Sequence, residues 1–384
     1  MLRAFEEWQI DRNKIVSITT DNGSIMVAAV KNSFDAQHLH CFAHTLNLVT
    51  EAAISHDQIQ PLIKKVRGGV KFIKNSVIMS DRLQKAQEDN DVPEGKMKKM
   101  ILDVKTRWNS TYYMVEQFLD LIRIISQLLV DDPSSPVMPS SPEIETLKNV
   151  IVILRPLESA TTEISGDKYV TISKIIPMVN MLSSHLENSF GQLDPTTEAV
   201  RKVLLSAVQK RFGCAEANSN IAIATILDPR FKNINFKNPI GCGKAISRLK
   251  KLIVEDVSSE SEEDQEIRDQ AFNFWKTHKE LVYGKRRKKT QEVSDTSELI
   301  LYLANPLSPL KSNPLLEWED IKTVLPGLYK QSRRFLLFMA TSMPCERLFS
   351  KAGATVTQDR IRLSGKYLNK LTFLGSMSKD EWFK

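Results

Sequence analysis

The chain has few cysteines and no long apolar run. Its four cysteines (Cys41, Cys214, Cys242 and Cys345) are widely spaced and form no Cys-x-x-Cys pair. This usage is typical of a reducing compartment, and it argues against a disulfide framework or a complete zinc finger in this chain. No apolar stretch approaches the roughly 18 residues of a membrane span, and the opening residues lack the basic start and apolar run of a signal peptide. The sequence therefore predicts a protein of the cytosol or nucleus with no membrane partner.

The composition is that of a globular protein. Charged residues make up 26% of the 384 residues and hydrophobic residues 42%, which is unlike a disordered chain. This length allows one large core or two to three smaller ones. The net charge of +7 is compatible with a nucleic-acid partner, although many basic nuclear proteins bind only other proteins.

Two distant segments each offer one carboxylate in a setting suited to a metal ion. Asp21 ends the β-branched run 15–20, which alternates like a strand and stops at an Asn-Gly turn. Glu346 follows Pro344 and would lie in the first turn of a helix. The pair could share Mg²⁺ or Mn²⁺, but two-metal phosphoryl transfer usually needs a third carboxylate. The alternatives are that Asp21 only forms a turn and that Glu346 only favours a helix N-terminus.

A second cluster consists of His38, His40, Cys41 and His44. The segment 37–53 has helical periodicity, which would place Cys41 and His44 on one helical face. Structural zinc needs four ligands, usually including a second pair from elsewhere, and none is visible in the sequence. We therefore expect no zinc finger, and a packed helix is at least as good an interpretation of this cluster.

The rest of the chain is predicted to be mainly helical. A further strand is expected over 100–106. Apolar residues then recur with a 3.6-residue period over 115–130, 144–165, 172–188 and 197–211, with Asp194 as a helix cap. Further helices are expected over 315–325, 327–339 and 366–377.

Two charged runs interrupt this pattern. The acidic run 258–266 predicts a solvated loop or helix start. The basic run Lys285-Arg286-Arg287-Lys288-Lys289 has two interpretations, a solvated linker or a patch for nuclear import and phosphate contact.

Four motifs occur in a fixed order along the chain. They are Thr20-Asp-Asn-Gly-Ser24, Cys41-x-x-His44 followed by Leu46 and Asn47, Thr106-Arg-Trp-Asn-Ser-Thr111, and Glu346-Arg-Leu-Phe-Ser350. Asp359-Arg-Ile-Arg-Leu363 and an apolar helix follow them. With these motifs nearly the whole chain resembles the hAT-superfamily transposases and their domesticated descendants of the BED-zinc-finger type. Each motif is weakly specific alone, but four in order are strongly so.

The resemblance implies an α/β fold. The expected architecture is an N-terminally incomplete RNase H-like core, interrupted by a large all-α insertion and completed by a C-terminal helical dimerisation segment. The expected boundaries are residues 1–115 for the partial core, 116–297 for the insertion, and 298–384 for the end of the core with the dimerisation region. By the same resemblance, dimerisation residues are expected at Leu348, Phe349, Leu363, Leu368, Leu371 and Leu374.

The resemblance also assigns roles near DNA. Asp21 and Glu346 match the second and third catalytic carboxylates of the family. Cys41 and His44 match a helix that supports strand-end binding, and Arg107 with Trp108 matches a position close to the scissile DNA. A Trp can stack on an unpaired base while an Arg contacts phosphate; the alternative for Trp108 is a core tryptophan. With the basic run 285–289, these residues form the expected nucleic-acid-binding set.

The first carboxylate of the family lies several strands before the Thr-Asp-Asn-Gly segment. Only twenty residues precede Asp21, so we expect the first catalytic strand and the BED finger to be absent and the metal site to lack a ligand. The leading hypothesis is a domesticated nuclear protein without transposase activity and without a bound cofactor. Such a protein would self-associate, touch DNA weakly, and take part in transcription regulation with other nuclear proteins. The alternatives are a Mg²⁺- or Mn²⁺-dependent transposase whose N-terminal part lies outside this chain, and an adaptor that kept the fold for packing alone.

Overall fold

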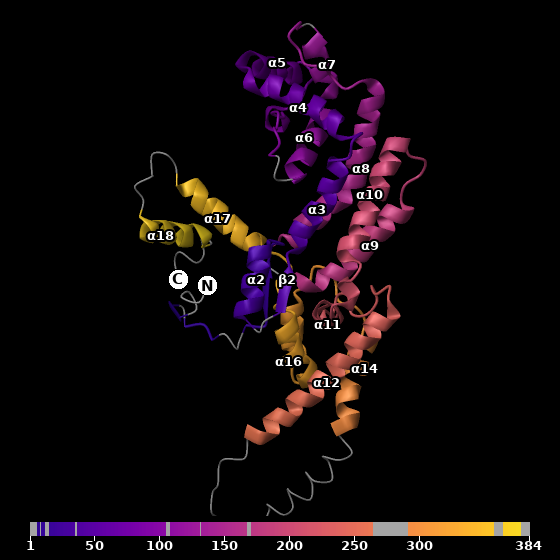
Figure 1. The fold of residues 1–384 in the computed structure, drawn as a ribbon, viewed down its shortest axis with the longest axis vertical. Helices are drawn as coiled ribbons and strands as arrows, with labels where there is room; N and C mark the ends of the chain where they lie inside the picture. Colours follow the sequence, from indigo (N-terminus) through magenta and orange to yellow (C-terminus); the bar gives the residue numbers. More distant parts are fainter. Residues whose placement is uncertain are drawn as a thin grey trace, which may run out of the picture.

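The computed structural model describes residues 6–7, 9–11, 15–34, 37–104, 108–130, 132–166, 170–263, 291–356 and 364–377. These residues form an elongated, mainly helical molecule (Figure 1). The elements up to the middle of the chain are β1 (Ser17–Thr20), α2 (Ser24–Ser33), β2 (Gln37–His40), α3 (Phe42–Ile54), α4 (Gln60–Asn75), α5 (Val77–Glu88), η2 (Glu94–Lys96), α6 (Trp108–Asp120), α7 (Ile122–Val130) and α8 (Ser141–Ile164).

The second half of the molecule is again helical. Its elements are η3 (Ile172–Lys174), α9 (Ile175–Asn188), α10 (Pro195–Phe212), η4 (Ala215–Ala217), α11 (Ser219–Leu227), α12 (Pro239–Glu263), α14 (Gln291–Ala304), α15 (Pro314–Ile321), α16 (Pro326–Phe335), α17 (Met343–Thr355) and α18 (Gly365–Ser376). In the described residues, no helix is sufficiently long and apolar to span a bilayer.

The sheet of the described residues has two parallel strands. β1 pairs with β2 in the register Ser17 to Gln37 and Thr20 to His40, and α2 provides the crossover that parallel strands require. The strand predicted over 15–20 is thus confirmed, starting two residues later. The sheet lies near the middle of the long axis, where α3 continues from β2 into the upper helices (Figure 1).

Two local predictions were wrong. Residues 37–40 form β2, not the start of a helix, because their side chains alternate: His38 and His40 share one face and Leu39 is buried on the other. The helix starts only at Phe42. Residues 100–104 form no strand; Asp103 instead accepts two hydrogen bonds from Arg67 (2.8 and 2.5 Å) and one from Thr111 (2.9 Å), so it anchors this segment to α4 and α6.

The expected long helices are confirmed. α8, α9 and α10 lie where the 3.6-residue period placed them, and α8 packs against α3, α6, α9 and α10. Asp194 caps α10 by accepting a hydrogen bond from the Thr197 backbone N–H (3.0 Å). The segment expected to be one helix over 115–130 is two helices, α6 and α7, which break at Leu121.

Residues 227–232 form a buried turn, called the 227–232 turn below, that joins this bundle to the lower helices. Asp228 and Arg230 are buried and form a two-bond ion pair (2.9 and 2.7 Å), and Ser173 of η3 donates to Asp228 (2.6 Å). Lys232 donates to the carbonyls of Tyr302 and Asn305 (both 2.6 Å). The turn therefore fastens η3 and the end of α14 to α11.

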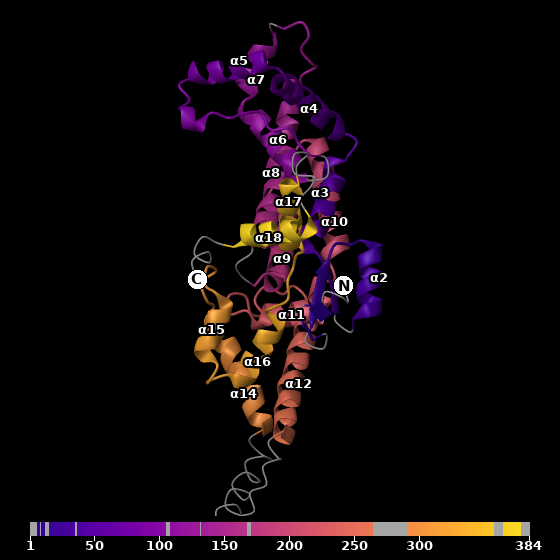
Figure 2. The same cartoon turned by 90° about the vertical axis from the view of Figure 1, so that its left-hand side faces the viewer.

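Helices α17 and α18 form a pair to one side of the body of the molecule in Figure 1, and in the view of Figure 2 this pair lies in front of the body. The two helices pack against each other, and neither contains a buried residue. This pair, the 343–376 hairpin, is the end of the described chain. Its helix α18 was predicted from the apolar period over 366–377 and is confirmed within one residue.

Candidate functional site

Asp21 is held in a turn directly after β1. Its Oδ1 accepts a hydrogen bond from the Gly23 backbone N–H (3.2 Å), and its carboxylate is exposed. A Cβ atom at Gly23 would lie 3.0 Å from this oxygen. The Asn-Gly sequence after the strand thus forms the turn that it predicts, and the Asp21 carboxylate stays accessible.

Cys41 joins three segments at the end of the sheet. Its backbone N–H donates to the Thr20 carbonyl (2.8 Å), which fixes the start of α3 beside Asp21. Its Sγ accepts hydrogen bonds from the backbone N–H groups of His44 (3.5 Å) and Ser342 (3.3 Å). The Cys41 side chain is 0% exposed. In this conformation Cys41 is a buried helix cap, and its role in nucleic-acid binding stays a prediction.

The segment before α17 completes this junction. Thr19 donates from Oγ1 to the Met339 carbonyl (2.5 Å), and the Phe42 N–H donates to the Ala340 carbonyl (2.8 Å). These bonds bring together stretches about 320 residues apart in the chain. In the first turn of α17, the exposed Glu346 accepts from the Ser342 hydroxyl (2.9 Å). The two predicted carboxylate segments thus meet at one end of the sheet.

These residues do not make up a complete site for Mg²⁺ or Mn²⁺. Asp21 and Glu346 supply two carboxylates, and each already accepts one local hydrogen bond. Within the described ranges, no group of three or more His, Cys, Asp or Glu side chains could hold a metal ion. The junction therefore brings together two segments that each carry one carboxylate, whereas two-metal phosphoryl transfer usually needs a third.

The histidines around β2 make local contacts. His38 and His40 lie edge to face with ring centroids 4.8 Å apart, and His38 Nε2 forms a hydrogen bond with the Thr20 hydroxyl (2.8 Å). Burial lowers the pKa of His38, and the charges of His40 and Lys31 lower it further. A neutral His38 at this position fits a hydrogen-bonded structural residue. His44 is half-buried in the first turn of α3.

Trp108 begins α6 inside the core. Its side chain is 4% exposed and packs edge to face on Tyr112, while its backbone N–H donates to Asn47 of α3 (3.4 Å). In this conformation the buried ring belongs to the core, in agreement with the alternative interpretation of Trp108, and its role near DNA stays a prediction. Arg107 and the basic run Lys285–Lys289 lie outside the described residues.

The predicted dimerisation residues lie on the 343–376 hairpin, except Leu363, which is outside the described residues. Leu348 and Phe349 are exposed on α17, Leu371 and Leu374 are exposed on α18, and Leu368 is half-buried. The sequence analysis missed Tyr367 and Phe373, which are more exposed than the leucines of α18.

The sequence analysis also missed a row of cations on α12. Lys244, Arg248 and Lys251 are exposed, whereas Ala245 and Leu249 between them are buried. The signal was present as a 3.6-residue apolar period with basic residues in the intervals. α12 begins at Pro239.

Comparisons with known proteins give two matched domain families. Residues 39–153 match the ZBED1 RNase-like helical domain, and residues 298–378 match the hAT family C-terminal dimerisation region. The first match covers α3 to α8 and therefore includes the Cys41 cap and Trp108. The second covers the segment before α17 and the 343–376 hairpin.

Individual relatives agree with these matches. The chain is 26% identical to zinc finger BED domain-containing protein 4 of Homo sapiens, over 96% of this chain and 32% of that protein. It is 24% identical to zinc finger BED domain-containing protein RICESLEEPER 3 of Oryza sativa subsp. japonica, over 92% and 50% of the two chains. It is 23% identical to a putative AC transposase of Zea mays, over 95% and 48%. The chain thus spans a third to a half of the length of these relatives.

Proposed function

The chain belongs with the hAT transposase-derived proteins of the zinc finger BED domain-containing type, and from this premise we propose that it is a domesticated nuclear protein that acts through self-association. The matched dimerisation region supports self-association as such. The proposal adds the surface, the location and the absence of transposase activity. DNA and other nuclear proteins are the proposed further partners.

The observation that carries the proposal is the exposed apolar surface of the 343–376 hairpin. Phe349 is 74% exposed and Phe373 is 62% exposed, and Tyr367, Leu371 and Leu374 add to the same helix pair. Neither helix buries any residue in the single chain. Large aromatic side chains left in water on a helix pair are typical of an interface, because aromatic anchors contribute most of the binding free energy there.

A double substitution tests this surface. Phe349→Ser with Phe373→Ser should raise the dissociation constant of the dimer by roughly 30-fold or more, since the loss of one hot-spot side chain costs about 2 kcal/mol. Sedimentation equilibrium over a range of protein concentrations measures this constant. The matched control is Val77→Ser with Ile78→Ser, because these α5 side chains are similarly exposed and lie outside the matched dimerisation region. An unchanged mass in the hairpin variant would refute the proposed interface.

The proposed absence of transposase activity rests on the carboxylate pair at the end of the sheet. We interpret β1, α2 and β2, with α17 beside them, as part of an RNase H-like core in which Asp21 and Glu346 occupy the second and third carboxylate positions. Two carboxylates do not complete the usual site for two-metal phosphoryl transfer. On this proposal Glu346 stabilises the first turn of α17 through the helix dipole and its bond from Ser342.

A transposase is the second candidate, because the fold brings the Asp21 and Glu346 segments together. The third carboxylate would then come from polypeptide outside the described residues. Nicking of duplex DNA in Mn²⁺ should be absent from the chain on the first proposal. If nicking is observed and is abolished by Glu346→Gln, but not by Glu187→Gln on an exposed turn of α9, the second candidate is correct.

The nuclear location is proposed from the basic run 285–289, which has the composition of an import signal. A fluorescent fusion of the chain should therefore accumulate in nuclei. Replacing the five basic residues of the run by Gln should leave the fusion distributed through the cell, and nuclear accumulation that survives this change would assign the location to another segment.

A further inference from the structure

Helix α12 has two chemically opposite faces over its described side chains. Cys242, Ala245, Leu249 and Ile253 are buried against the body, where α12 packs on α11 and α16. Residues 244, 247, 248 and 251 fall on the opposite side of the helix and are all exposed. The burial pattern therefore fixes which way this second face is turned, namely toward solvent.

The exposed face carries three cations that form no ion pair with a described side chain. Lys244, Arg248 and Lys251 have no carboxylate within ion-pair distance among the side chains that the structure describes. Other basic residues of the molecule do have such partners, for example Lys65 with Glu143 (2.6 Å) and Arg201 with Glu198 (2.7 Å). Like charges on adjacent helical turns repel one another, so this row gains from an anionic partner.

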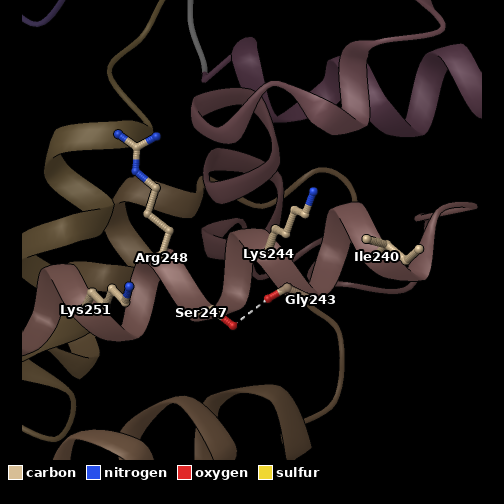
Figure 3. Close-up of a pocket in the computed structure, with 6 residues that line it drawn as sticks. All are labelled: Ile240, Gly243, Lys244, Ser247, Arg248 and Lys251. Carbon is tan, nitrogen blue, oxygen red and sulfur yellow. Dashed lines mark hydrogen bonds between the residues drawn. The ribbon is translucent and has the colours of Figure 1, made fainter.

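The three cations line an open groove of about 560 Å³, together with Ile240, Gly243 and Ser247. Figure 3 shows Lys244 and Arg248 extending from the same side of α12, with Lys251 one turn further along. The Ser247 hydroxyl donates to the Gly243 carbonyl of its own helix (2.9 Å). The groove is thus lined mainly by the aliphatic stems of its three basic side chains, whose charged end groups are available to an anionic ligand.

The spacing of the row suits a polyanion with regularly spaced charges. Seven residues separate Lys244 from Lys251, which corresponds to about 10.5 Å along a helix axis. One strand of a DNA duplex carries a negative charge about every 3.4 Å of its axis, so the row spans about three phosphates. The planar guanidinium of Arg248 at the centre can contact a phosphate through two N–H groups.

We propose that this exposed face of α12, residues Lys244, Arg248 and Lys251, binds the phosphate backbone of duplex DNA without reading its sequence. The proposal deepens the DNA contact in the proposed function and rests on it, but it is independent of self-association through the 343–376 hairpin. Phosphate contacts of this kind position a protein on DNA and release counterions, so their signature is salt dependence.

The test uses the full chain, a fluorescently labelled duplex of random sequence, and a series of salt concentrations. The variant Lys244→Gln with Arg248→Gln and Lys251→Gln removes three charges and keeps helix-forming side chains at exposed positions. The slope of log affinity against log salt should fall by about three, since each lost phosphate contact removes about one unit. Affinity at low salt should fall by at least roughly tenfold.

The matched control removes three exposed charges from α4, by Lys64→Gln with Lys71→Gln and Lys74→Gln. The control should keep the wild-type slope within about one unit. An equal loss in both variants would overturn the proposal, because net charge alone would then explain binding. An unchanged slope in the α12 variant, or no DNA binding by the wild-type chain at low salt, would also overturn it.

Two further measurements separate the remaining outcomes. Polyglutamate is offered as a competitor, and tighter binding of polyglutamate than of duplex DNA would assign the face to an acidic protein and overturn the proposal. The mass of each variant is measured in parallel by sedimentation. If the α12 variant keeps its oligomeric state and loses DNA affinity, the α12 proposal stands even where the hairpin proposal fails.

Discussion

The 227–232 turn and the 343–376 hairpin differ in which kinds of side chain they bury and which they expose. The turn buries three charged residues, Asp228, Arg230 and Lys232, whereas the hairpin exposes aromatic residues such as Phe349 and Phe373. In the turn, each of these charged groups has partners: Asp228 accepts from Arg230 and Ser173, and Lys232 donates to backbone carbonyls. In the hairpin, α17 and α18 pack on each other to a limited extent, and none of their described side chains is fully buried.

This difference indicates that the turn contributes to the stability of the chain and the hairpin to its association with a partner. A buried charge is tolerated only where it is fully paired. The paired charges of the 227–232 turn therefore contribute to the packing of the helices around it. Covering an exposed apolar surface lowers the free energy, so the exposed apolar side chains of the hairpin indicate a surface for binding. Substitutions in the turn should therefore change unfolding, and substitutions in the hairpin should change assembly.

The largest effect is expected at Asp228. Replacing Asp228 by Asn leaves the buried Arg230 guanidinium without its anion, and this should lower the free energy of unfolding by about 3–5 kcal/mol. Urea unfolding followed by circular dichroism measures the loss. Asp120→Asn is the matched control, because its ion pair with Lys98 is half exposed and should be worth less than about 1 kcal/mol. Equal losses would contradict the special role of the buried turn.

Trp318 comes next. Its indole N–H donates to the Leu227 carbonyl (2.7 Å) and its side chain is fully buried. Trp318→Phe should cost about 2–3 kcal/mol, from the unpaired carbonyl and the smaller ring. Trp108→Phe is the comparison, since Trp108 is also buried but its indole forms no hydrogen bond with a described residue. If Trp108→Phe costs more in the same denaturant experiment, the hydrogen bond to the turn is not the deciding term.

A smaller, pH-dependent effect is expected at Asp103. Hydrogen bonds from Arg67, and also from Thr111, lower the pKa of Asp103 below the ordinary value of an Asp carboxyl. The charged form is therefore stabilised by folding, and this contribution is present above the unfolded pKa and is lost as the pH falls through the folded pKa. Asp103→Asn should cost about 1–2 kcal/mol near pH 7. The gap in unfolding free energy between wild type and variant should narrow as the pH falls below about 3.9, the pKa of an unfolded Asp; a gap that stays constant at lower pH would contradict the ion pair.

The smallest effect on unfolding is expected in the hairpin. Phe349→Ser should change the unfolding free energy of the monomer by no more than about 0.5 kcal/mol, because the side chain is mostly in water already. Unfolding at protein concentrations below the dimer dissociation constant measures this value, and at higher concentrations the variant should lose the stabilisation that dimerisation gives. A large loss in the monomer would mean that the hairpin packs on its own chain.

Helices were predictable wherever the signal was local. The period over 144–165 and the Asp194 cap were sufficient to place α8 and α10, because helix hydrogen bonds join residues four apart. The four residues of β2 were not predictable. Their alternation of buried and exposed side chains is too short to be told apart from the helical period that follows it. Residues 100–104 have a strand-like composition, but the Arg67–Asp103 pair, 36 residues apart, holds them in another conformation.

The candidate site was predictable in its chemistry and not in its geometry. The resemblance assigned Asp21 and Glu346 to one site, and the fold brings their segments together through Thr19, Cys41 and Ser342. The burial of Cys41 and Trp108 could not be read from local patterns, because burial depends on contacts with residues from other helices. The cation row on α12 was visible as a period, but its exposure needed the packing of α12 on α11.

By itself, the sequence determined the helical character, most helix positions and the two carboxylate segments, because periodicity, caps and short motifs act over a few residues. Only the tertiary structure decided which polar groups are buried and paired, as in the 227–232 turn, and which apolar and basic groups face water, as on the hairpin and on α12. The reason is that burial is a property of contacts between distant segments, and the same Asp, Phe or Lys stabilises, binds or is merely solvated according to what those contacts leave exposed.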